Sequence, residues 1–92
     1  MSSVFRIENH EPIEASGHWR LDQQIEEVSD WLQEEHNAER VRGSILDIGF
    51  NSRLHGSIAM QGEVLPTEFL RQLVSLDITL WLSIYRRFTN ET

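Results

Sequence analysis

The chain has 92 residues, which is the usual size of a single domain. Its composition, 39% hydrophobic and 25% charged, is typical of a globular protein rather than a disordered one. It contains no cysteine, which excludes disulfides, thiol nucleophiles and cysteine-ligated zinc. No apolar run approaches the ~18 residues of a membrane span. The first residues lack the apolar core of a signal peptide, so we expect a cytoplasmic protein.

Acidic residues are concentrated in the first part of the chain. The net charge is −7, from 15 acidic and 8 basic residues, and every basic residue is an arginine. Residues 1–39 hold ten acids and two arginines, a net of −8, whereas residues 40–92 hold five acids and six arginines, a net of +1. Such a chain repels nucleic-acid phosphates and anionic membranes. It attracts basic proteins, although a solvated surface that keeps the protein soluble is the simpler interpretation.

The chain begins with a short β-prone segment, Val4–Ile7, which Pro12 interrupts. We expect residues 1–14 to form an edge strand or a loosely held arm. The next segment, Ala15–Leu21, is expected to be a short strand that contains Trp19.

Asp22 is a good N-cap for a helix over about residues 23–38. The apolar residues predicted to line one face of this helix are Ile25, Val28 and Leu32. At about 100° per residue, the opposite side gathers four acids, Glu26, Glu27, Asp30 and Glu34. Acids near the helix start suit its dipole, but Glu34 and Glu35 near the predicted end do not.

Three strands and a helix are predicted in the rest of the chain. Ser44–Phe50 and Leu54–Met60 are expected to pair as a hairpin across a turn at Asn51-Ser52. A helix is expected to start near Pro66, with leucines and Phe69 on its apolar side. The last strand, Ile78–Tyr85, alternates cleanly. Its expected helix-facing residues are Ile78, Leu80, Leu82 and Ile84, and those of the other face are Thr79, Trp81, Ser83 and Tyr85.

From residue 15 to residue 87, the predicted order is β-α-β-β-α-β. This order is that of an α+β ferredoxin-like two-layer sandwich, with two helices on one face of an antiparallel sheet. Residues 88–92 form a polar tail. The sheet face that the helices do not cover would expose Trp81 and Tyr85, which is more than a monomer usually exposes. We expect either the N-terminal arm or another chain to cover it.

Two segments carry a family resemblance. The first is the helix-and-strand segment Leu65–Tyr85. It has a Leu-Pro helix start, paired leucines and an alternating strand that closes on tyrosine. The other is Gly17-His18-Trp19-Arg20-Leu21 followed by an acidic helix. Together they resemble a bacterial domain-of-unknown-function family with a ferredoxin-like fold, over about residues 17–85. The resemblance implies that fold and brings no catalytic residues. Small acidic proteins of this kind also resemble immunity proteins that pair with toxins.

No residue pattern predicts a reaction, a metal site or a cofactor. The four histidines, His10, His18, His36 and His55, lack the i, i+4 spacing of helical metal ligands. The acids of the first helix are expected to be exposed, and exposed carboxylates make poor general acids at neutral pH. Asp47 interrupts an apolar strand, and a cross-strand pair with Arg53 or His55 is its expected arrangement, with a binding role as the alternative.

We therefore predict a non-enzymatic acidic protein-binding module. Its sharpest form is an immunity-type inhibitor that occupies a basic surface on a bacterial toxin through Glu26, Glu27, Asp30 and Glu34. One alternative is a self-associating domain, in which Trp81 and Tyr85 or the edge strands of two copies pair. The other is a small-ligand or enzymatic site between paired sheets, lined by His18, Asp47, Arg53 and His55.

Overall fold

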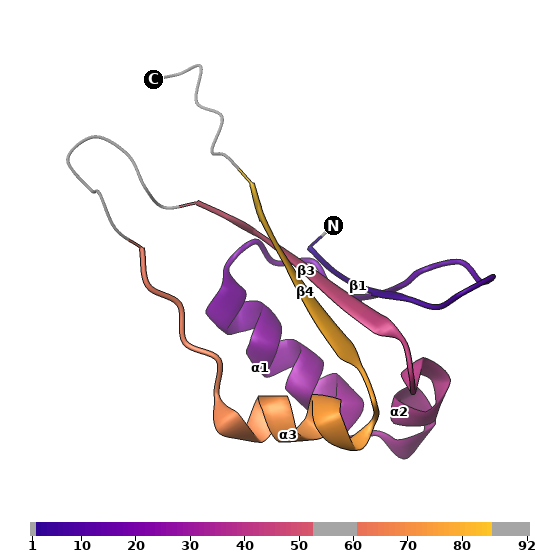
Figure 1. Ribbon diagram of the computed structural model, residues 1–92. Coiled ribbons are helices and arrows are strands. Elements are labelled where there is room, and N and C mark those ends of the chain that lie inside the picture. The colour runs from indigo at the N-terminus through magenta and orange to yellow at the C-terminus, as the bar shows by residue number, and fades with distance from the viewer. Residues whose placement is uncertain (1, 53–60, 86–92) are drawn as a thin grey trace.

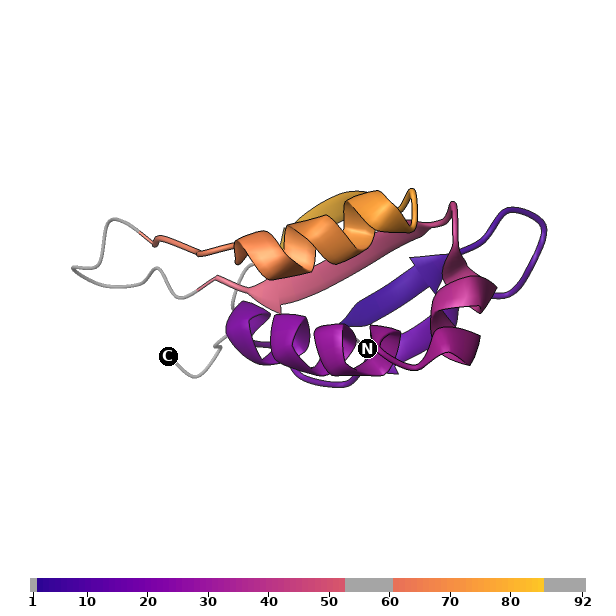
Figure 2. The same ribbon diagram turned by 90° about the horizontal axis from the view of Figure 1, so that it is seen from below.

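The computed structural model of the chain describes residues 2–52 and 61–85. Figure 1 shows helices packed against a twisted sheet, and Figure 2 shows the same elements from below. The strands of the described residues are β1 (Ser3–Arg6), β2 (Ile13–Ser16), β3 (Ile45–Asn51) and β4 (Thr79–Tyr85). The helices are α1 (Leu21–Leu32), α2 (Glu35–Val41) and α3 (Thr67–Ser75). The fold is therefore a small α+β fold, as the sequence predicts, and it is compatible with a two-layer sandwich.

The sheet order is β2-β1-β3-β4, so β1 is an interior strand. The sequence predicts an edge strand or a loose arm here, and the difference has a clear cause. Phe5 is fully buried and its ring stacks on Trp31 of α1, with 5.3 Å between the ring centroids. Burying an aromatic side chain of this size stabilises the fold by about 1.5–3 kcal/mol. The N-terminal segment thus belongs to the sheet and does not cover its open face.

The sheet is mixed, which corrects the prediction of an antiparallel sheet. β1 pairs with β2 and β3 in antiparallel fashion, whereas β3 and β4 are parallel over their full length. The reason lies in the connection, because α3 lies between β3 and β4 and a helical crossover returns the chain in the same direction. The predicted hairpin partner, Leu54–Met60, lies outside the described residues. The ferredoxin-like topology is not confirmed.

The predicted helix over residues 23–38 is two helices in the structure. α1 already starts at Leu21, which is buried, and it ends at Leu32. Glu34 has extended backbone and precedes α2, so Glu35 lies in a first helical turn. An acid is favourable at a helix start and unfavourable at a helix end, so the break relieves the conflict that the sequence shows there. At the break, the carbonyl oxygen of Trp31 accepts hydrogen bonds from the backbone N–H of Glu34 at 3.4 Å and from the side-chain amide of Asn37 at 3.0 Å.

The core lies between the helices and one face of the sheet. Its buried sheet residues are Phe5 of β1 and Leu46, Ile48 and Phe50 of β3, and they alternate along the strands. The predicted stripe of α1 is buried against them, and Phe69 and Leu73 of α3 join it. Ile78 is buried, and Leu80 packs against this cluster.

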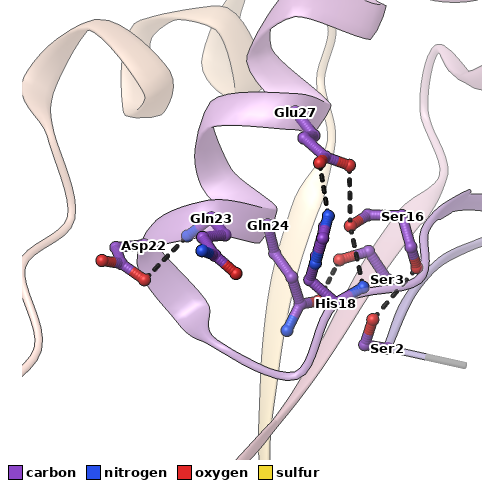
Figure 3. Close-up of polar contacts among 8 residues, drawn as sticks. All are labelled: Ser2, Ser3, Ser16, His18, Asp22, Gln23, Gln24 and Glu27. Carbon is purple, nitrogen blue, oxygen red and sulfur yellow. Dashed lines mark hydrogen bonds and ion pairs between the residues drawn. The ribbon is translucent and has the colours of Figure 1, made fainter.

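A buried polar contact fixes α1 on the sheet. Gln24 is fully buried, and its side-chain amide nitrogen donates to the carbonyl oxygen of Gly49 in β3 at 2.7 Å. The hydroxyl of Ser3 in β1 donates to the side-chain oxygen of the same residue, as Figure 3 shows. One side chain of α1 is therefore hydrogen-bonded to two adjacent strands, and that arrangement sets the rotation of the helix.

Replacing this amide tests its contribution to stability. We expect Gln24→Ala to lower the free energy of unfolding by about 2–4 kcal/mol, because it leaves a cavity and two unpaired polar groups. Urea unfolding followed by circular dichroism measures the change. Gln23→Ala on the same helix is the control, since that side chain is exposed and the cost should stay within about 0.5 kcal/mol. Equal losses in the two variants would contradict this role for Gln24.

Candidate functional site

The four acids predicted to face away from the core are all exposed. Glu26, Glu27 and Asp30 lie on α1, and Glu34 lies at the junction with α2. The opposite side of α1 carries its buried residues. Within the described part of the chain, Glu26, Asp30 and Glu34 form no ion pair. These three carboxylates, which we call the acidic surface, therefore carry charge that the described residues do not neutralise.

Glu27 differs from the other three because it is bound locally. One carboxylate oxygen lies 2.6 Å from Nε2 of His18, and the other accepts a hydrogen bond from the hydroxyl of Ser16 at 3.4 Å (Figure 3). These contacts tie the connection after β2 to α1. The Ser16 hydroxyl contacts the Glu27 carboxylate and not the His18 imidazole. The three side chains therefore lack the serine–histidine–acid order of a catalytic triad. Glu27 is better explained by local structure than by recognition.

Two further acids lie beside the acidic surface, in a groove between α1 and α3. Ile25 and Phe69 contribute to its lining, and the acids along it are Asp22, Glu26, Asp30 and Glu68. Asp22 pairs with Arg20 at 3.0 Å, and hydrogen bonds from that guanidinium hold the pKa of Asp22 below its ordinary value. Asp22 therefore keeps its negative charge at neutral pH and below it. The groove extends the negative charge of α1 toward α3.

The sheet face opposite the helices carries a second polar group, centred on Asp47 of β3. The predicted partners Arg53 and His55 lie outside the described residues. In the structure, Asp47 pairs with Arg6 of β1 at 3.2 Å and accepts a hydrogen bond from Ser83 of β4 at 3.0 Å. Asp47 thus joins three adjacent strands, and its side chain is only 18% exposed. This is a cross-strand pair of the expected kind with a different partner.

The two aromatic residues predicted to lie opposite the helix-covered face do so. Trp81 lies beside Arg6, Ile45 and Asp47 in a shallow hollow, and 60% of its surface is exposed. Tyr85 meets the ring of Trp19 edge-on, with 5.5 Å between centroids. The predicted strand Ala15–Leu21 is wrong, because the strand is β2 (Ile13–Ser16) and Trp19 lies in the connection that leads into α1. Ile45 shares this face with Asp47 because the two alternate along β3, whereas Arg6 could not be found from the sequence because only strand register brings it here.

The residues of the predicted small-ligand site are not brought together in the part that the structure describes. His18 contacts Glu27 on the helix side, whereas Asp47 contacts Arg6 and Ser83 on the open sheet face. Among the described residues, no group of three potential metal ligands gathers at one place. No helix among them has the length and apolar character needed to cross a membrane.

Comparison with known proteins adds no relative, since no protein-family model, curated protein or solved structure matches the chain. The resemblance to a domain-of-unknown-function family therefore stays a prediction.

The local role of Glu27 is testable against its neighbour on the helix. Glu27→Ala should lower the free energy of unfolding by about 0.5–1 kcal/mol, because it removes the contacts to His18 and Ser16. Glu26→Ala is the matched control, with the same helix propensity change and no such contacts, and should stay within about 0.5 kcal/mol. Chemical denaturation of both variants measures the difference. A Glu26 variant as unstable as the Glu27 variant would argue against this distinction.

Gly49 leaves room for the ring of Tyr85. A Cβ at position 49 would lie 2.6 Å from Cε2 of Tyr85, so Gly49→Ala should move the ring away from Trp19. We expect a change in tryptophan fluorescence with a stability loss of about 1 kcal/mol or less, because an exposed ring can give way. Gly17→Ala has no atom within 4 Å of its new Cβ and serves as the control. An unchanged spectrum in the Gly49 variant would contradict the contact.

Proposed function

We propose that this chain is a protein-binding module whose acidic surface on α1 docks against a basic surface of another protein. The supporting observation is that Glu26 and Asp30 lie one turn apart on α1 and Glu34 follows at the junction with α2, all exposed and none in an ion pair within the described residues. The like charges of Glu26 and Asp30 at this spacing destabilise the helix by about 0.2–0.5 kcal/mol. A basic partner would remove that cost and convert it into binding energy.

The groove between α1 and α3 gives the docking surface a second wall. Asp22 and Glu68 stand along it with Glu26 and Asp30, above apolar side chains of both helices. Asp22 and Glu68 are partly neutralised by Arg20 and Arg71, so the strongest attraction belongs to α1 itself. An acidic surface of this kind accelerates encounter with a basic partner more than it raises the final affinity.

The specific form of the proposal is an immunity-type inhibitor, in which the basic partner is a bacterial toxin. The substrate-binding clefts of enzymes that act on phosphate backbones are basic, and an acidic module that occupies one would block it. The contacts within the chain do not favour a catalytic function as an alternative. In the described polar clusters a serine hydroxyl donates to Glu27 or Asp47, but each carboxylate is already paired, with His18 or with Arg6, and in neither cluster does the hydroxyl contact an imidazole.

The test compares two charge-neutralised variants as bait in affinity capture from the native lysate. The first is Glu26→Gln, Asp30→Asn, Glu34→Gln, and the control is Glu8→Gln, Glu11→Gln, Glu14→Gln, which removes the same charge from exposed sites outside α1. We expect a protein that wild type and the control retain at low salt, that the first variant loses, and that high salt releases.

The captured protein is then purified and its binding measured. The Kd for the first variant should be weaker by about tenfold or more at low salt, mainly through a slower association rate. The control should bind like wild type. Capture lost equally by both variants would show that net charge rather than the acidic surface determines binding. Capture retained equally by both would show that the acidic surface does not contribute, and either result would overturn the proposal.

A further inference from the structure

The two edges of the sheet are protected to very different degrees. β2 forms one edge and has four features that discourage pairing with another strand. It is only four residues long, it carries the charged Glu14, Pro12 stands just before it, and its register with β1 shifts between Ser3 and Val4. Such an edge is a poor template for a further strand.

β4 forms the other edge and has none of these features. It is seven residues long, and each of them pairs with β3 in one regular parallel register. Its sequence, TLWLSIY, contains no charged residue and no proline. Among the described residues, no strand pairs with its outer side. A long, regular, uncharged edge of this kind is a template for strand addition.

Apolar side chains are exposed on both faces of this edge. Trp81 projects from the open face, and Leu82 and Ile84 project from the helix side, where Ile84 is 66% exposed because α3 does not extend over it. Soluble monomers expose isolated apolar side chains, but a continuous apolar strip is unusual.

α3 adds two apolar side chains next to the same edge. Gln72 faces α1, because its side chain exchanges hydrogen bonds with Ser29 at 2.7 and 3.1 Å. Leu70 and Val74, two residues before and after it, lie about 160° round the helix from Gln72 and so face away from α1. α1 contacts β2 and β3 whereas α3 contacts β4, so this flank lies on the β4 side of the molecule. Val74 is 79% exposed.

We infer that the edge of β4 is the seam of a homodimer, in which the β4 strands of two copies pair in antiparallel fashion. The two-fold axis runs perpendicular to the sheet, so the two sheets join into one and both helical layers lie on the same side. With the axis at Leu82, the middle residue of β4, Trp81 stands opposite Ser83 of the second copy. Leu80 stands opposite Ile84. A large side chain thus meets a small one on the open face, and two apolar side chains meet on the helix side.

Charge does not oppose a second copy at this edge. The chain has a net charge of −7, so two copies can approach only where the acids are not opposed. β4 carries no charge, and the acidic surface belongs to α1, which packs over β2 and β3. The seam therefore brings no like charges face to face. This inference does not depend on the proposed function, because the two surfaces lie on different elements.

The first experiment is sedimentation equilibrium of the full chain from about 1 µM to about 1 mM, a range that detects weak dimers. Wild type should show a monomer–dimer equilibrium. Ile84→Lys places a charge at the seam and should weaken dimerisation by at least about tenfold. Ile45→Lys is the matched control, because Ile45 is also exposed, at 40%, but lies on β3 away from the edge. It should dimerise like wild type, and thermal unfolding confirms that both variants fold.

Three outcomes would overturn the inference. A wild type that remains monomeric at all concentrations excludes the second copy as the occupant. Loss of the dimer in the Ile45 variant but not in the Ile84 variant would show stacking through the open face rather than pairing at the edge. The third comes from hydrogen exchange. In wild type, the β4 amides should become more protected from exchange as the protein concentration rises, and in the Ile84 variant they should not. Protection that is independent of concentration would contradict the seam.

Discussion

The arrangement of the whole molecule depends on one buried amide. Gln24 of α1 is hydrogen-bonded to Ser3 of β1 and to Gly49 of β3, with no access to water. An amide buried this deeply has to keep its partners, because an unpaired one would cost about 1–3 kcal/mol. α1 is therefore held in one rotation about its axis. That rotation turns Val28 and Leu32 into the core, and the same rotation turns the acidic surface toward solvent.

Local patterns in the sequence predict the parts of the structure that local physics controls. The 3.6-residue period of α1 is sufficient to separate its buried residues from its acids, and the two-residue period of β4 is sufficient to place Trp81 opposite the helices. The unfavourable position of Glu34 and Glu35 at the end of a long predicted helix was also visible, and it marks the point where the chain breaks into α1 and α2. The hydrogen bonds that close α1 at this point, from the backbone N–H of Glu34 and the side chain of Asn37 to the carbonyl oxygen of Trp31, are visible only in the structure.

Strand pairing could not be predicted in the same way, because it depends on contacts between distant parts of the chain. The burial of Phe5 against Trp31 decides that β1 lies inside the sheet, and no local pattern contains that information. The partner of Asp47 follows from the same register, since Val4 lies opposite Asp47 and brings Arg6 within reach from 41 residues away. The parallel pairing of β3 and β4 is likewise a property of the crossover through α3 and not of either strand.

The acidic surface and the β4 edge lie on different elements of the described fold, and this separation has a consequence for both proposals. A two-fold axis perpendicular to the sheet keeps both helical layers on one side, so both acidic surfaces of a dimer would face the same direction. Each would lie over the half of its own sheet that is away from the seam, because α1 packs over β2 and β3. A basic partner with two suitable surfaces could then engage both copies at once, and the second contact would gain from the effective concentration that the first one sets.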